Sequence, residues 1–259
     1  MSQLAQFKAI LLFFTRIPAR CLGRLPDSEE PIELSAALPM VPLAGALIGL
    51  AGGAVALIAS LPFSGSLIPA ILAVATMMLL TGALHEDGLA DMADSLAGQD
   101  RAKRLDILRD SRLGTYGASA LVLSLLLRVA LISALLAAAG ALAALLCLIA
   151  AHAWSRAASF WLPYHLAHAR SGGAAVAFGR PTWPRLRQAL LAAGLIVMLT
   201  AASVAGVIAT LLASLLAFLV PVFLADYCER RYGGQTGDLI GAMQQLCELC
   251  FLLTIVATL

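Results

Sequence analysis

Charged residues are scarce in this chain. Asp, Glu, Lys and Arg make up 12% of its 259 residues, whereas hydrophobic residues make up 61%. Soluble domains carry about 25% charged residues, so this composition excludes an ordinary soluble domain and indicates a membrane protein. Aromatic residues are also few, at 6%. The basic residues are interleaved with acids and have no aromatic stacking platform beside them, so we expect no nucleic-acid partner.

A disulfide framework, internal repeats and low-complexity linkers are missing as well. Among the five cysteines, Cys247 and Cys250 form a CxxC pair, but it lies in an apolar segment without a second pair elsewhere. We therefore interpret the cysteines as packing residues. No cleavable signal is evident, and the start, LAQFKAILLFFTRIPA, is typical of an amphipathic or half-buried helix. We expect one integral-membrane domain, 1–259.

Long hydrophobic runs make up most of the chain. A transmembrane helix needs about 20 apolar residues, and the runs predict an all-α, polytopic helical membrane protein with about seven transmembrane helices. The run 189–225 is too long for one crossing, so we divide it near residues 205 and 206. The predicted spans are 38–61, 67–84, 114–136, 139–161, 189–205, 207–225 and 239–258.

The loops on the two sides of the predicted membrane differ in charge. Loops 62–66 and 137–138 contain no charged residue. Most Arg and Lys residues lie in the loops on the N-terminal side, which are 1–37, 85–113, 162–188 and 226–238. Basic loops stay in the cytoplasm, so we expect this side, and any site built from its loops, to face the cytoplasm.

The segment 85–117, HEDGLADMADSLAGQDRAKRLDILRDSRLGTYG, is a charged island that holds seven of the 15 acidic residues. As a helix continuing out of the span 67–84, it would carry Asp87, Asp91 and Asp94 on one face with Glu86 at the edge. Like charges at this spacing repel, so we expect a cation among them, and oxygen ligands suit Mg²⁺ or Mn²⁺. A solvated surface helix is the alternative, although 85–98 contains four acids and no Lys or Arg.

The end of the island, RDSRLGTYG, combines basic and hydroxyl side chains. Arginine binds phosphate through two parallel hydrogen bonds. We therefore predict phosphate contacts from Arg109 and Arg112, with Ser111 and Thr115 as hydroxyl donors.

A glycine-rich turn, YGGQTGDLIGA, lies at the cytoplasmic end of the last predicted span. Such a turn before a helix offers backbone N–H groups to a phosphate, so Gly233, Gly234 and Thr236 are predicted substrate contacts. Asp238 could complete a metal shell. The loop 169–185 is either a substrate lid or a connector.

Arg128 lies in the middle of a predicted span, where an ionisable residue is costly and faces the protein interior. Glu248, in the last span, is its expected partner. The sequence leaves open whether this pair is structural or functional.

Five motifs together resemble the cobalamin-5'-phosphate synthase family, also called adenosylcobinamide-GDP ribazoletransferase. They are FTRIP at 14–18, PLAG at 42–45, the HEDGLADMAD block, the RDSRLGTYG block and GGQTGD at 233–238. They follow in order from near the N-terminus almost to the C-terminus, and as a set they are specific.

The resemblance implies an Mg²⁺-dependent transferase of the bacterial inner membrane. It would join adenosylcobinamide-GDP to α-ribazole or its 5'-phosphate, release GMP and form adenosylcobalamin or its 5'-phosphate. A homo-oligomer, or an assembly with other enzymes of the cobalamin pathway, is left open.

The resemblance also assigns roles to the acidic residues. Glu86, Asp87, Asp91 and Asp94 would form the metal shell, with Asp91 or Asp94 as the catalytic base. Asp110 and Asp238 would be further metal ligands.

Two other functions agree with parts of the sequence only. A CDP-alcohol phosphotransferase-like phospholipid synthase would use D-x-x-D-G-x-x-A-R, but Leu84 replaces the first aspartate and Met92 the arginine. An ion-coupled transporter would carry acids inside its spans, and only Glu248 fits.

Overall fold

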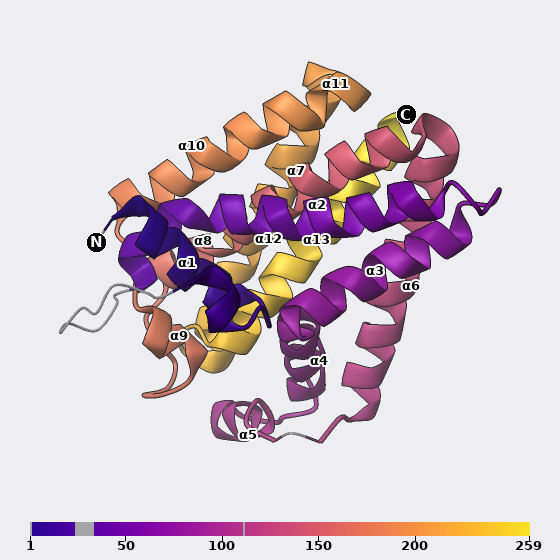
Figure 1. The fold of residues 1–259 in the computed structure, drawn as a ribbon. Coiled ribbons are helices and arrows are strands. Elements are labelled where there is room, and N and C mark those ends of the chain that lie inside the picture. Colours follow the sequence, from indigo (N-terminus) through magenta and orange to yellow (C-terminus); the bar gives the residue numbers. More distant parts are fainter. Residues whose placement is uncertain (1, 24–33, 111) are drawn as a thin grey trace.

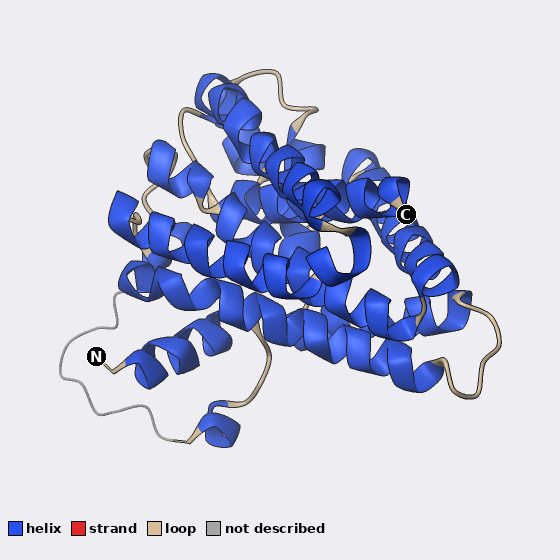
Figure 2. Cartoon of the chain, turned by 90° about the horizontal axis from the view of Figure 1, so that it is seen from above, coloured by secondary structure: helices blue, strands red, loops and turns tan. Residues whose placement is uncertain are grey.

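The computed structural model describes residues 2–23, 34–110 and 112–259, and within these ranges the chain is helical and has no strand (Figures 1 and 2). The helices are α1 (Gln3–Phe14), η1 (Ala19–Leu22), η2 (Leu34–Met40), α2 (Val41–Ala59), α3 (Leu67–Thr81), α4 (Leu84–Ser95), α5 (Arg101–Ile107), α6 (Thr115–Ala139), α7 (Ala141–Ser159), α8 (Trp161–His165), α9 (Ala174–Phe178), α10 (Trp183–Thr200), α11 (Ala202–Ala205), α12 (Val207–Tyr232) and α13 (Gly237–Thr258).

The predicted class, a polytopic helical membrane protein, is confirmed, and the predicted count of seven spans is approximate. Five helical stretches are long and apolar enough to cross a membrane, or six if the bent pair α3 and α4 counts as one span. The five are Leu34–Ala59, Thr115–Ala139, Ala141–His165, Val207–Tyr232 and Gly237–Thr258. The expected span 189–205 is divided between α10 and the short α11.

The acidic helix does not continue straight out of the preceding span, as we expected. α3 ends at Thr81, and the next two residues, Gly82 and Ala83, both adopt left-handed backbone conformations, with φ of +66° and +56°. α4 therefore leaves α3 at an angle of 89°, which is visible in Figure 1 as a downward turn. Because α4 carries four acids, we treat it as lying outside the membrane-spanning segments.

The interior of the bundle is built mainly from small residues. α2 packs along α7, and a Cβ atom at Gly45, Gly49 or Gly53 would collide with His152, Leu148 or Leu145 of α7. Small residues at such contacts let helices approach closely inside a membrane. Large apolar side chains instead cover the outside, as lipid contact requires; examples are Leu79, Leu123 and Ile208.

The prediction for the first helix is also confirmed. α1 is half-buried, because Ala5, Ile10 and Phe14 face the core while Leu4 is exposed. The cysteines are all free, and the expected packing role fits the buried Cys147, Cys228 and Cys247 but not the exposed Cys21.

Candidate active site

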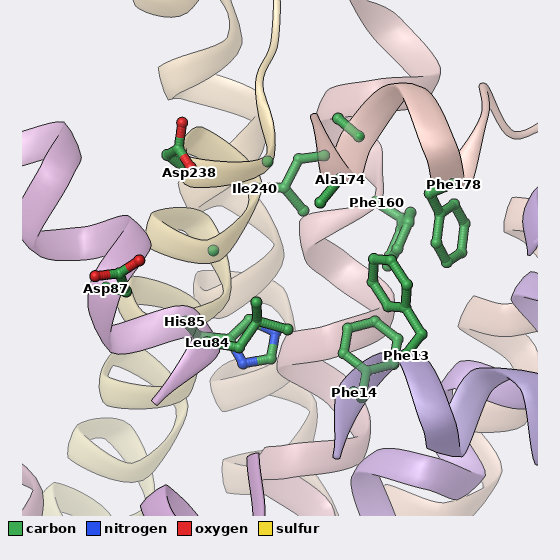
Figure 3. A pocket seen from close by; sticks show the side chains of 13 residues that line it. Phe13, Phe14, Leu84, His85, Asp87, Phe160, Ala174, Phe178, Asp238 and Ile240 are labelled. Carbon is green, nitrogen blue, oxygen red and sulfur yellow. The ribbon is translucent and has the colours of Figure 1, made fainter. Parts of the chain in front are cut away.

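Asp87 and Asp91 lie on the face of α4 that packs against the start of α13, where Asp238 is in the first helical turn. Gly88 permits this approach, because a Cβ atom there would lie 2.7 Å from the carbonyl oxygen of Asp238. Figure 3 shows Asp87 and Asp238 side by side on the two helices. The structure therefore brings together carboxylates that are about 150 residues apart in the sequence.

The neighbouring carboxylates affect the pKa of Asp91. Burial, followed by the negative charges of Asp87, Asp238 and Asp94, raises the pKa of Asp91 from 3.8 to about 7. A carboxyl group of this pKa is half ionised near neutral pH, and a cation among these groups would be strongly favoured. Within the described residues, no three acidic, His or Cys side chains are gathered tightly enough to enclose a metal ion. Carboxylate oxygens are donors that Mg²⁺ prefers, and a metal ion among them stays a prediction.

Asp94 is held differently from Asp91. Its carboxylate accepts hydrogen bonds from the backbone N–H groups of Gly114 and Gly117, both at 2.7 Å. It therefore caps the N-terminus of α6 and ties the end of the acidic segment to α4. In the described part of the chain, the carboxylate of Asp91 accepts no hydrogen bond, which makes it the better candidate for the base. Both assignments stay predictions.

Glu86 lies apart from the other acids of α4, which corrects its predicted place in the metal shell. Its side chain is buried, and Arg128 Nη1 donates to its Oε1 at 2.8 Å. Glu86 and Asp87 are neighbours in sequence but point to different sides of α4, because successive residues of an α-helix do not share a face. Glu86 therefore belongs to the protein interior.

The expected pair of Arg128 and Glu248 is confirmed, with 3.1 Å between Arg128 Nε and Glu248 Oε1. Arg128 also donates to Gln245, and Gln244 donates to Glu248 at 2.8 Å. Together with Glu86, these buried side chains link α4, α6 and α13 directly behind the carboxylates.

The arginine-rich segment after α5 is exposed. Arg112 donates to Asp110 at 2.6 Å, and these hydrogen bonds lower the pKa of Asp110 to about 2. Asp110 is thus engaged by its own neighbour, and no bond within the described residues joins it to Asp91. Arg109 lies 3.9 Å from Asp106. Thr115 is exposed at the start of α6, and Ser111 lies outside the described residues.

Some polar groups of the glycine-rich turn are bonded within the adjacent helices. Gly233 ends α12 with φ of +69°, and its N–H donates to the Glu229 carbonyl at 2.8 Å. This N–H is not free for phosphate, contrary to our expectation. The Thr236 hydroxyl caps α13 by accepting from Leu239 N–H at 3.3 Å. The predicted substrate contact of Gly234 stays a prediction.

Arg170, which the sequence did not single out, is the direct partner of Asp238. Its Nη2 lies 2.9 Å from Asp238 Oδ2. The loop is held there because Gln235 N–H donates to the Ala167 carbonyl and Ala169 N–H donates to the Gln235 carbonyl. The basic character of 169–185 was the available signal. This loop therefore adds a guanidinium to the site.

A pocket next to the carboxylates was not foreseen either. Asp87 and Asp238 lie at one side of it, and phenylalanines from α1, α9 and the end of α7 line the other (Figure 3). The cavity has a volume of about 90 Å³ and is partly open to solvent. Small-molecule sites are mostly apolar with a few polar groups, and the lining of this pocket has that character.

Known proteins match almost the whole chain. The family model of cobalamin-5-phosphate synthase matches residues 6–256. An adenosylcobinamide-GDP ribazoletransferase of Azorhizobium caulinodans is 48% identical over 96% of this chain and 94% of its own length. The protein of that name from Xanthobacter autotrophicus is 45% identical over 95% of this chain and 93% of its own length. A third, from Rhizobium meliloti, is 42% identical over 89% of this chain and 91% of its own length.

No solved structure matches this chain. The extent of the match to the family model, together with relatives above 40% identity along nearly the full length, is decisive. The chain belongs to the cobalamin-5-phosphate synthase family.

Proposed function

We propose that this protein joins adenosylcobinamide-GDP to α-ribazole or its 5'-phosphate, releases GMP and forms adenosylcobalamin or its 5'-phosphate. The names of its relatives support these substrates. The observation that carries the proposal is the meeting of Asp87, Asp91 and Asp238 beside Arg170, because a diphosphate substrate needs both cation ligands and a guanidinium.

In the proposed reaction, a ribose hydroxyl of the ribazole attacks the phosphorus that bears the corrinoid linker. A new P–O bond forms there, and the P–O bond to GMP breaks. The hydroxyl proton passes to a carboxylate, for which Asp91 is the candidate. A base works best when its pKa is near the operating pH, and the pKa of about 7 for Asp91 meets this condition.

Asp87 and Asp238 are the residues that would hold Mg²⁺, or Mn²⁺ in its place, with Asp91 beside them as the base. Such ions use one or two carboxylates and complete their shell with water and substrate phosphate. When bound, the ion would neutralise the charge that builds up on the diphosphate. Arg170 is placed to bind a phosphate oxygen on the same side.

We further propose that the site faces the cytoplasm from the bacterial inner membrane. The basic residues of the loops around α5 and α9 support this orientation, since basic loops are retained on the cytoplasmic side. α4 lies on the same side of the molecule as α5 and α9 (Figure 1).

Turnover by the purified protein in detergent tests the proposal. Adenosylcobinamide-GDP and α-ribazole 5'-phosphate are supplied with and without Mg²⁺, and GMP and the corrinoid product are measured. We expect Mg²⁺-dependent product from the wild type and none from Asp91→Asn. Asp106→Asn, an exposed acid paired with Arg109, is the matched control and should retain activity. Absence of product, with CMP released from a CDP-activated lipid instead, would support a phospholipid synthase.

A further inference from the structure

Four phenylalanines line one side of the pocket beside the carboxylates and form an aromatic wall, in which each ring contacts the next. Phe13 and Phe178 have ring centroids 5.3 Å apart, Phe178 and Phe160 4.6 Å, and Phe160 and Phe14 6.5 Å. Phe14 and Phe13 then meet at 5.0 Å and complete the set. The four rings come from α1, the end of α7 and α9, so three distant segments of the chain build one aromatic wall.

The aromatic wall continues directly into the acidic helix. The Phe14 ring stacks on His85 with 5.7 Å between centroids and 15° between planes. His85 is two residues before Asp87 on α4, and Asp87 and Asp238 border the same pocket. A ligand that fills the aromatic part can therefore extend a covalently attached group to the carboxylates.

The substrates of the proposed reaction offer three large groups: the corrin ring, guanine and the benzimidazole base of α-ribazole. The corrin ring with its amide side chains is several times larger than a benzimidazole and is too large for this cavity. Guanine carries polar groups along both ring edges, and the phenylalanine wall offers them no hydrogen-bond partner. Burying such groups unpaired is unfavourable. The benzimidazole is flat, fused and almost entirely apolar, so it matches the wall.

The chemistry of the reacting atoms leads to the same assignment. In α-ribazole the base is attached directly to the ribose whose hydroxyl attacks. A base held by Phe160 and Phe178 would place that ribose toward Asp87 and Asp238. Guanine is separated from the reacting phosphorus by its own ribose and a phosphate, which makes it a poorer fit to a pocket that borders the carboxylates.

We propose that this aromatic pocket binds the benzimidazole base of α-ribazole and positions its ribose for attack. The proposal rests on the proposed function, because that function supplies the substrate. Aromatic contacts contribute about 0.5–1.5 kcal/mol beyond area burial. Removing one ring should therefore weaken ribazole binding about two- to ten-fold.

Two variants and one control test this assignment. Phe178→Leu removes one ring of the wall but stays apolar. Ala174→Leu adds bulk at the pocket mouth, at an exposed position where folding is not at risk. Phe223→Leu makes the same exchange at a phenylalanine that is 72% exposed on α12. We expect the first two to raise the Kd and KM for α-ribazole with the KM for adenosylcobinamide-GDP unchanged, and the control to match the wild type.

Equilibrium binding of α-ribazole, measured by calorimetry, separates this proposal from the proposed function. If transfer is absent in the wild type but Phe178→Leu and Ala174→Leu weaken binding, the pocket assignment holds and the function is wrong. If transfer occurs and neither variant changes ribazole binding, the assignment is wrong and the function stands. Free dimethylbenzimidazole should compete with α-ribazole; competition with adenosylcobinamide-GDP instead would overturn the assignment.

Discussion

The buried charge cluster behind the active site allows a quantitative prediction for Arg128→Met. Methionine keeps much of the length and all of the apolar character of the stem but removes the guanidinium. The side chains of Arg128, Glu86 and Glu248 are 1%, 5% and 0% exposed. After the substitution, Glu86 and Glu248 would lose the guanidinium that contacts both of them, and the buried Arg156 and His152 would be the nearest remaining basic groups.

Breaking a buried ion pair by removing one partner costs about 3–5 kcal/mol. Arg128 serves two carboxylates at 2.8 and 3.1 Å, so we expect the loss in unfolding free energy to lie toward the upper end, at about 5 kcal/mol. Glu86→Gln leaves the contact between Arg128 and Glu248 in place and should cost less, about 1–3 kcal/mol.

The assay is unfolding of the purified protein in mixtures of a mild detergent and SDS, with circular dichroism as the measure of helix content. Arg230→Met is the matched control, because its partner Asp226 lies on the same helix and both side chains are exposed. An exposed pair contributes about 0–1 kcal/mol. If Arg128→Met were as stable as Arg230→Met, the cluster would not carry the stability that we assign to it.

Three further predictions concern the acidic helix. Gly88→Val should lower kcat about ten-fold or more by forcing α4 away from Asp238, since a displacement of about 1 Å can lower a reaction rate by more than that. A variant with the kcat of the wild type would contradict the close contact between α4 and α13. Asp94→Asn should cost about 1 kcal/mol of stability through the weakened α6 cap, seen as a lower melting temperature. Because a raised pKa leaves Asp91 protonated at low pH, activity should rise as pH increases through about 7. A higher Mg²⁺ concentration should move the midpoint of this rise to lower pH. An activity that stays constant from pH 6 to 8 would contradict the prediction.

The membrane class and the helical stripe of carboxylates were predictable because both depend on local sequence periods. Asp87, Asp91 and Asp94 are three or four residues apart, so their helix fixes their common side. The pairing of Arg128 with Glu248 was also predictable, since two opposite charges in apolar spans must find each other.

The remaining features depend on contacts between distant segments. The 89° turn after Thr81 requires two successive left-handed residues, of which only Gly82 is a sequence signal. The sequence predicts Glu86 as a metal ligand because spacing within one helix does not reveal that the side chain of Glu86 contacts Arg128 of another helix. The aromatic pocket joins Phe13 to Phe178, and no sequence period connects residues so far apart.

The adjacent residues Glu86 and Asp87 have a joint consequence for α4. One is bound inside the bundle by Arg128, and the other is exposed at the edge of the aromatic pocket. Rotation of α4 about its own axis would pull Glu86 from its cation and carry Asp87 toward apolar side chains, and both changes are unfavourable. The rotation of α4 about its own axis is thus fixed by the charged residues on its two sides. The direction in which the reactive carboxylates point therefore depends on the ion pair in the protein interior.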